Sequence, residues 1–192
     1  MITLHATKKL FDKLPLKEQG VLSPTGRSKY LYELPVLHDN PLSGWHGNLV
    51  TFQRRNCVLL LHNGTRFPLL IPNLTKPDFA ELNFHFVDVF MSTLLKCGAE
   101  ARHLDAAQHL LRPLQTDSGT SRSELSTLTQ VKFETECMLD HDGVNIADMT
   151  GYSISAWLAG LFRSVKEAGY IVPRDQMLAL LDTIKTDQAD SK

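Results

Sequence analysis

The stretch Trp45–Ile71, with the sequence WHGNLVTFQRRNCVLLLHNGTRFPLLI, decides the fold. It holds three runs of strand-forming residues, at Trp45–Gln53, Cys57–His62 and Thr65–Ile71. Short polar segments separate the runs. One of them is Asn63-Gly64, a pair that accepts the positive φ values of a two-residue hairpin turn. The stretch therefore predicts a three-stranded antiparallel meander.

The first turn of this meander, Arg54-Arg55-Asn56, sets the register of the first two strands. Arginine is a poor residue for a left-handed backbone and asparagine tolerates it, so we expect a three-residue loop with Asn56 left-handed. Gln53 would then lie opposite Cys57, and Asn48 opposite His62. A shift of one residue would move every side chain of a strand to the other face.

In the expected register both faces of the sheet are apolar. One face would carry Val50, Phe52, Val58, Leu60, Phe67, Leu69 and Ile71. The other would carry Trp45, Leu49, Cys57, Leu59, Leu61 and Leu70. A sheet that is apolar on both sides must be covered on both sides.

Helices supply the cover, and capping residues and apolar stripes indicate where they lie. Before the meander we expect a strand at Ile2–His5, a helix at Lys8–Leu14, and a long loop at Pro15–Gly44 with one short strand around Tyr30–Leu34. After it we expect helices at 75–97, 100–112, 121–139, 154–165 and 173–184, with a polar loop at Gln115–Thr120. Trp45 and Trp157 are expected in the core. The fold class is α+β: a small antiparallel sheet, made of the 45–71 meander and the N-terminal strand, packed with about six helices.

Length and composition predict a single domain over residues 1–192. At 192 residues and 43% hydrophobic content the chain is too apolar for intrinsic disorder, and its formal net charge of −1 excludes a wholesale polycation. No apolar run reaches the ~18 residues of a membrane span, and the N-terminus lacks a signal pattern, so we expect a cytoplasmic protein and no membrane partner.

The charge is unevenly distributed along the chain. Residues 1–76 carry ten Lys/Arg and four Asp/Glu, a balance of +6, whereas residues 77–192 carry ten and seventeen, a balance of −7. We expect a basic part of strands and loops at 1–76, an acidic helical part at 77–186, and a frayed tail at 187–192. The split favours an anion or nucleic-acid surface only if the basic residues cluster in space; otherwise the two parts simply face each other.

Motifs for metal, nucleotide and nucleophile chemistry are missing from the sequence. Cys57, Cys97 and Cys137 form no CxxC pair and are expected to be reduced and mostly buried. There is no HExxH, no Gly-rich phosphate loop and no GxSxG elbow. We therefore predict no metal and no cofactor.

A basic and hydrogen-bonding set remains as the candidate site. Its binding candidates are Lys8, Asn48, Arg54, Arg55 and Arg122, and its candidate acid–base groups are His46 and His62. The arginine pair would lie a strand length from the histidines, so the compact cluster would be Lys8, His46, Asn48 and His62. The alternative is a polar sheet end whose side chains cap nearby backbone groups.

Three short motifs carry a resemblance to a known family. They are Thr7-Lys8-Lys9-Leu10, the run Trp45-His46-Gly47-Asn48-Leu49 with Arg54-Arg55-Asn56-Cys57, and Thr120-Ser121-Arg122-Ser123. With them the chain resembles a bacterial family of uncharacterised proteins, domain of unknown function 6933, over most of Met1 to about Phe162. His46 and Asn56 depart from the pattern, where an aromatic residue and a lysine are expected. The resemblance implies a bacterial or phage-borne cytoplasmic protein, and it does not imply an activity.

Three functions stay open. The leading hypothesis is a non-enzymatic binding or interaction module that contacts nucleic acid through its basic N-terminal part. The first alternative is an enzyme acting on a phosphodiester or nucleotide substrate with a His/Lys/Asn site. The second is a protein that binds a protein partner, such as an antitoxin-like inhibitor. Whether the chain forms a homo-oligomer is left open by the sequence.

Overall fold

The computed structural model describes residues 1–165 and 169–184. The tail predicted at 187–192 lies outside the described residues.

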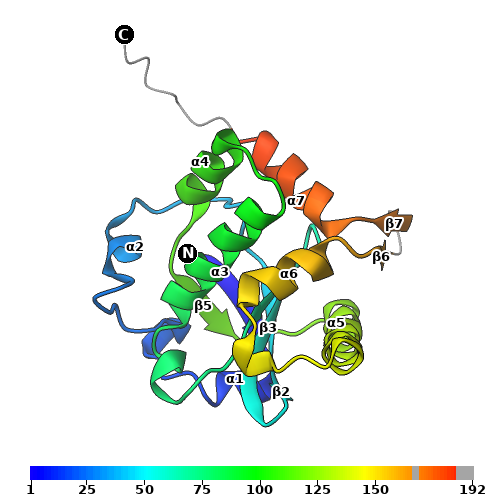
Figure 1. Cartoon of the computed structure of the whole chain (residues 1–192). Helices are drawn as coiled ribbons and strands as arrows, with labels where there is room; N and C mark the ends of the chain where they lie inside the picture. Colours follow the sequence, from blue (N-terminus) through cyan, green and yellow to red (C-terminus); the bar gives the residue numbers. More distant parts are fainter. Residues whose placement is uncertain (166–168, 185–192) are drawn as a thin grey trace.

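A five-stranded mixed sheet organises the chain (Figure 1). Its strands are β1 (Ile2–Ala6), β2 (Trp45–Phe52), β3 (Arg55–His62), β4 (Pro68–Ile71) and β5 (Leu114–Asp117). Their order in the sheet is β4-β3-β2-β1-β5. The β2–β3–β4 meander is antiparallel as predicted, whereas β1 runs parallel to both of its neighbours, β2 and β5. The α+β class is confirmed.

The register predicted for the first hairpin is wrong by three residues on β2, since Cys57 was expected opposite Gln53 and His62 opposite Asn48. Val50 pairs with Cys57 and Phe52 with Arg55, so the turn has two residues, Gln53 and Arg54. Both take positive φ, 45° and 66°. The two-residue turn with left-handed residues matches the twist of the strands, and that fit outweighs the poor intrinsic preference of arginine.

The shift exchanges the two faces of β2. Trp45 and Leu49 pack with Val58, Leu60 and their neighbours on β4 in one core cluster. Val50 and Phe52 join Cys57, Leu59 and Leu70 in the other. Both faces of the sheet are buried, as the apolar pattern predicts. The β2 side chains, however, point to the opposite face from the one expected.

The second turn also differs from the expected Asn63-Gly64 turn. The chain turns over residues 63–66, closed by the backbone bonds from His62 N to Phe67 O and from Arg66 N to His62 O, both 2.9 Å. The positive φ falls on Arg66, at 58°. The turn therefore has four residues, and β4 begins after it, at Pro68.

Seven α-helices are found in the described residues. They are α1 (Lys8–Phe11), α2 (Lys29–Glu33), α3 (Leu82–Lys96), α4 (Ala101–Leu110), α5 (Arg122–Asp142), α6 (Gly151–Ala159) and α7 (Pro173–Asp182). Short 3-10 turns lie at Glu18–Gly20, Pro77–Phe79 and Ile146–Asp148, and β6 (Arg163–Val165) pairs with β7 (Gly169–Ile171) in a separate two-stranded sheet.

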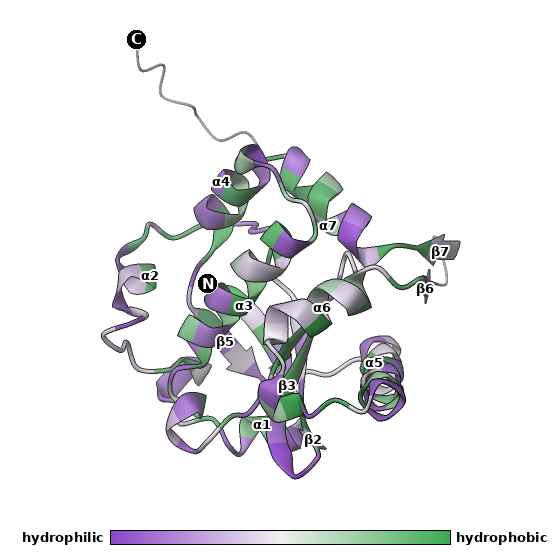
Figure 2. Ribbon diagram, in the orientation of Figure 1, coloured by the Kyte–Doolittle hydropathy of each residue, from purple (hydrophilic) through white to green (hydrophobic). Residues whose placement is uncertain are grey.

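The helices cover the sheet from its two sides, as Figure 1 shows with α5 on one side of the strands and α3 with α4 on the other. Apolar residues of α3, α4 and α7 complete the cluster around Trp45, where Phe86 and Phe90 meet the indole edge-on at 5.1 and 5.9 Å. Apolar residues of α5 and α6 complete the cluster around Leu59. The green inner surfaces of these elements in Figure 2 follow the same division.

Three local predictions need correction. Residues 29–33 form helix α2, where a strand was expected, because Leu31 alone needs burial and one helical turn provides it. Leu114–Asp117 is strand β5, where a loop was expected, because β1 offers a free parallel edge. The fourth predicted helix stops at Ala159, and Arg163 begins β6.

Trp157 contradicts the expectation of a core position. Its side chain is 42% exposed, whereas Trp45 is fully buried. Phe162, expected on the buried stripe of the same helix, is 69% exposed. Trp157 lies on the outer side of α6, whose buried side carries Ile154 and Leu158, and Phe162 lies after the end of this helix.

Candidate functional site

The predicted cluster of Lys8, His46, Asn48 and His62 does not form. His62 pairs with Trp45 across the hairpin, so its side chain lies on the α3 side of the sheet, 5.1 Å from the indole ring. His46 and Asn48 alternate with Trp45 and therefore lie on the opposite face. The three-residue register shift, being an odd number, moves the β2 side chains to the other face and separates the two histidines that the sequence placed together.

His62 is part of the core. It is 1% exposed, and its Nδ1 lies 2.9 Å from the hydroxyl of Thr65 in the second turn. Burial lowers the pKa of His62 to about 4, although the nearby carbonyls of Pro41 and Ser43 act in the opposite direction. Its Nε2 makes no hydrogen bond of good geometry with them. His62 is thus a neutral imidazole that holds the turn, as in the capping alternative, and solvent does not reach it.

Asn48 and Lys8 lie at the end of β1. The Thr7 hydroxyl donates to Asn48 Oδ1 at 2.9 Å, which ties the start of α1 to β2 and leaves the helix without a side-chain cap from Thr7. Lys8 follows directly and is exposed. Asn48 therefore has a positioning role, and Lys8 is free to meet solvent.

His46 belongs to a different cluster, which the sequence did not reveal. His5 Nδ1 lies 2.7 Å from Asp117 Oδ1, and the His5 and His46 rings are 4.8 Å apart. We call His5, His46 and Asp117 the polar centre. It lies where β1 and β5 end, at the carboxyl edge of parallel strands, which is where open sheets with helices on both sides usually bind ligands.

The protonation of the polar centre follows from its surroundings. Burial first, and then the neighbouring His5, lowers the pKa of His46, which is 3% exposed and has no hydrogen-bond partner at Nδ1. Burial alone would raise the pKa of Asp117. The hydrogen bonds from His5 and from Gly119 N–H, the latter at 2.8 Å, outweigh burial and lower it. At neutral pH the centre therefore holds an ionised carboxylate and a neutral His46.

An ion pair borders the polar centre. Arg66 pairs with Glu124 in the first turn of α5, and Glu124 also accepts from the Ser121 hydroxyl. Both charges lie close enough to His46 to affect its pKa in opposite directions. No group of three or more His, Cys, Asp or Glu side chains in the described residues is arranged to hold a metal ion.

Sequence reasoning missed His5 and Asp117 because they are 112 positions apart and meet only through the β1–β5 pairing. Alternation along Ile2–Ala6 does set His5 apart from the buried Ile2, Leu4 and Ala6. That signal marks His5 as facing the polar side of a strand but gives no partner.

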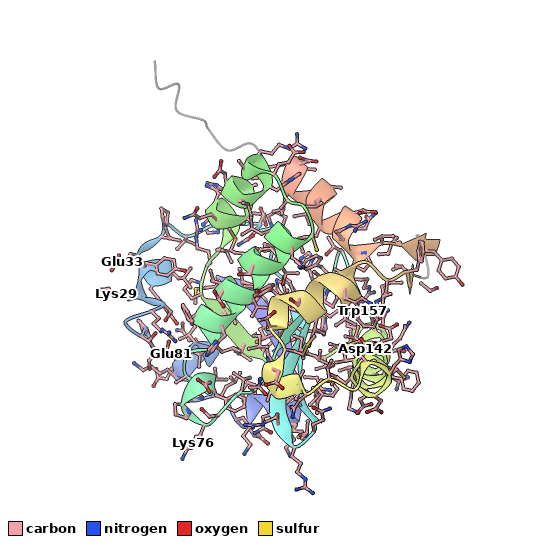
Figure 3. The ribbon with its side chains drawn as sticks, viewed as in Figure 1. Lys29, Glu33, Lys76, Glu81, Asp142 and Trp157 are labelled. Atoms are coloured by element: carbon pink, nitrogen blue, oxygen red, sulfur yellow. The ribbon has the colours of Figure 1, made fainter. Side chains whose placement is uncertain are left out.

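A second grouping is basic. Six exposed cations lie at the end of the molecule that holds the β2–β3 turn and α1, and form what we call the basic end: Lys8, Lys9, Lys13, Arg54, Arg55 and Lys76. Arg54 lies in the turn itself, α1 packs against β2, and Lys13, Asn56 and Lys76 line one cavity of about 320 Å³. In Figure 2 this end is the purple, hydrophilic one at the bottom of the view, and Figure 3 labels Lys76 there.

The cations of the basic end are not neutralised by ion pairs. Across the part of the chain that the structure describes, none of the six joins a salt bridge, although Asp12 lines the cavity beside Lys13. Other cations are engaged: Arg66 with Glu124, Arg163 with Glu134 and Arg112 with backbone carbonyls. Arg122 is exposed at the start of α5 and lies outside the basic end.

The cysteines are less buried than expected from the sequence. All three are free thiols; Cys57 is buried, Cys97 is half-buried and Cys137 is exposed. Burial raises the pKa of Cys57, and raises that of Cys97 to about 11. Cys57, the one thiol near the arginine pair in sequence, is therefore not activated.

A groove between α5 and α6 is both apolar and acidic. This groove holds a cavity of about 450 Å³ lined by Phe133, Cys137 and Trp157, with Glu134 and Asp142 as its acidic residues; Figure 3 labels Trp157 and Asp142. Phe133 is 64% exposed. Phe133 and Cys137 also line a cavity of about 370 Å³ between α5 and the end of β2, where Glu136 and Asp140 lie.

The comparison with protein families agrees with the three sequence motifs. Residues 3–176 match the family described as "Domain of unknown function (DUF6933)". The chain belongs to this family. No curated protein and no solved structure matches this chain. The motif residues lie around the two groupings described above: Lys8, Arg54 and Arg55 in the basic end, and His46 in the polar centre. No helix in the described residues is long and apolar enough to cross a membrane.

Proposed function

We propose that this chain is a binding protein of the bacterial cytoplasm that contacts nucleic acid through the basic end. The observation that carries the proposal is the spatial gathering of six exposed cations, none paired in the described residues, on one end of the molecule. A net charge split in sequence could arise without any such patch. Clustering is what electrostatic steering requires.

The shape of the basic end suits a phosphate backbone. A hairpin turn with two adjacent arginines projects beyond the sheet, and the lysines of α1 lie beside it. Arginine can bind a phosphate with two parallel N–H donors, while lysine adds a point charge. Such contacts fix position and carry no base preference, so we expect binding that is largely independent of sequence.

Salt dependence tests the proposal. With six phosphates neutralised, log K should fall against log[salt] with a slope of about −4 on single strands, from ~0.7 per contact. Fluorescence anisotropy with labelled single-stranded RNA, single-stranded DNA and duplex DNA, in salt from 50 to 200 mM, measures that slope. These salt limits are on the order of those over which phosphate binders lose most affinity.

Matched variants locate the surface. The Arg54→Gln/Arg55→Gln double variant should weaken binding and reduce the slope by about 1 to 2, from ~1 per lost cation. The control is Lys29→Gln/Lys96→Gln, which removes the same charge from exposed positions in α2 and α3, outside the basic end. Equal effects of both double variants would show that net charge alone acts, and no affinity at 50 mM salt would end the proposal.

The groove between α5 and α6 supports a second candidate function, binding of a protein partner. Exposed Phe133 and Trp157 beside an acidic rim suit a basic segment with apolar side chains. A photo-crosslinking residue at Phe133 in cells should trap one defined partner, and Phe133→Asp should remove it from affinity purification. A crosslink pattern equal to that from exposed Gln130 would count against this function.

A further inference from the structure

The polar centre has a chemistry that binding through the basic end does not use. Asp117 is ionised and can only accept, so the 2.7 Å contact requires that His5 Nδ1 carry the proton and donate it. This fixes the tautomer of His5 and leaves the lone pair on Nε2. A carboxylate that orients a histidine in this way is the arrangement of a general base.

His46 adds a second proton site in contact with the first. Its ring lies 4.8 Å from that of His5, and its Nδ1 is buried without a partner. An unpaired buried polar atom is costly, and its presence calls for an explanation such as a bound ligand or a reaction. His46 thus brings a second imidazole nitrogen to the site of His5.

Solvent and substrate can reach His5 but not the core. The His5 side chain is 26% exposed, and Asp117, Ser118 and Gly119 beside it are exposed. Lys8, the first cation of the basic end, comes three residues after His5 in the chain. Thr7, between them, hydrogen-bonds Asn48 of β2, so Lys8 begins α1 at the same end of β1 as His5.

We propose that His5, oriented by Asp117, is a general base that cleaves RNA held by the basic end, an inference that rests on the proposed function. RNA is the substrate because its 2′-hydroxyl supplies the nucleophile, so the reaction needs a correctly placed base and no external reactant. DNA has no such hydroxyl and must stay intact.

The step balances as follows. His5 Nε2 accepts the proton of a ribose 2′-hydroxyl while the 2′ oxygen forms a bond to the adjacent phosphorus. The bond from phosphorus to the 5′ oxygen of the next nucleotide breaks, and that oxygen takes a proton from water. The hydroxide left behind removes the proton from His5. The products are a 2′,3′-cyclic phosphate and a free 5′-hydroxyl.

The test uses the full chain with a labelled RNA and the DNA of the same sequence, with mass spectrometry of the products and anisotropy for binding. We expect cleavage of RNA alone with a cyclic phosphate end. His5→Ala should bind RNA normally and cleave it about 100-fold more slowly, the lower range for the loss of a general base. His141→Ala, at an exposed position of α5, is the control and should cleave at the normal rate.

Asp117 is a positioning residue, and its variant needs a readout beyond rate. In Asp117→Asn the ¹⁵N spectrum of His5 should lose the single Nδ1–H tautomer, and RNA cleavage should fall while RNA binding stays unchanged. RNA that is bound but not cleaved, or cleaved equally by His5→Ala, overturns the inference and leaves the proposed function standing. RNA that is not bound at all overturns both.

Discussion

Acidification should destabilise this protein through His62, and the expected size of the effect follows from its burial. The folded chain keeps the imidazole neutral, with a pKa of about 4, because the side chain is 1% exposed against Trp45. In the unfolded chain a histidine takes up its proton near pH 6.5. The unfolded state therefore binds more protons as the pH falls, and folding loses free energy between about pH 6.5 and pH 4.

From these two pKa values, the loss due to His62 amounts to about 2 kcal/mol on going from pH 7.5 to pH 5. Urea denaturation followed by tryptophan fluorescence measures the free energy of unfolding at each pH. His62→Gln removes the titrating group, so its stability should depend on pH by about 2 kcal/mol less than that of the native chain. His141→Gln, which changes an exposed histidine, should retain the native pH dependence.

Other groups also respond to acid, and the design separates them from His62. Burial lowers the pKa of His46. In Asp117, Glu124 and Asp78 burial raises the pKa of the carboxyl group, but hydrogen bonds and nearby positive charges outweigh it and lower the pKa. These contributions are common to both chains and cancel in the difference. An imidazole of His62 that titrates near pH 6.5 by NMR, or an unchanged pH dependence in His62→Gln, would refute the reasoning.

Three further outcomes concern packing and backbone. Gly47→Ala should lower the free energy of unfolding by about 1–3 kcal/mol in urea, because its Cβ would lie 2.8 to 3.1 Å from three leucine side chains, whereas Gly26→Ala, with open space around it, should change little. Arg163→Met should lower the free energy of unfolding by about 3 kcal/mol in the same assay, since it leaves Glu134 without its buried partner. An unchanged free energy of unfolding would show that water already screens the ion pair. Arg54→Gly should raise the free energy of unfolding by about 1 kcal/mol, and with it the thermal midpoint, because glycine accepts the φ of 66° without strain. The same variant should weaken nucleic-acid binding, and a lower midpoint would contradict the two-residue turn.

The hairpin shows how close local reasoning comes and where it stops. The apolar runs of Trp45–Ile71 and their order required an antiparallel meander buried on both faces, and both features are present. The register depended on which residues form the turn. Intrinsic backbone preference favoured Asn56, but the pairing of eight residues along β2 and β3 settled it on Gln53 and Arg54.

Helix positions divide in the same way. Strong start and stop signals placed α4, α5 and α7 within a few residues, whereas α3 begins seven residues after the predicted start at residue 75, behind a 3-10 turn at Pro77–Phe79. The signals failed at Leu114–Asp117, where a short polar segment becomes strand β5 because the edge of β1 is available to it. A segment of four residues has too little pattern of its own to reveal its partner.

By itself the sequence determined the α+β class, the meander, the two buried faces and the excess of basic residues before residue 77. Only the tertiary structure decided that Lys8, Arg54, Arg55 and Lys76 share one end of the molecule, that His62 is core, and that His5 meets Asp117. The reason is physical. Periodicity and turn preference act over a few neighbouring residues, whereas strand pairing and burial are set by contacts between residues far apart in the chain, and a functional site is made of such contacts.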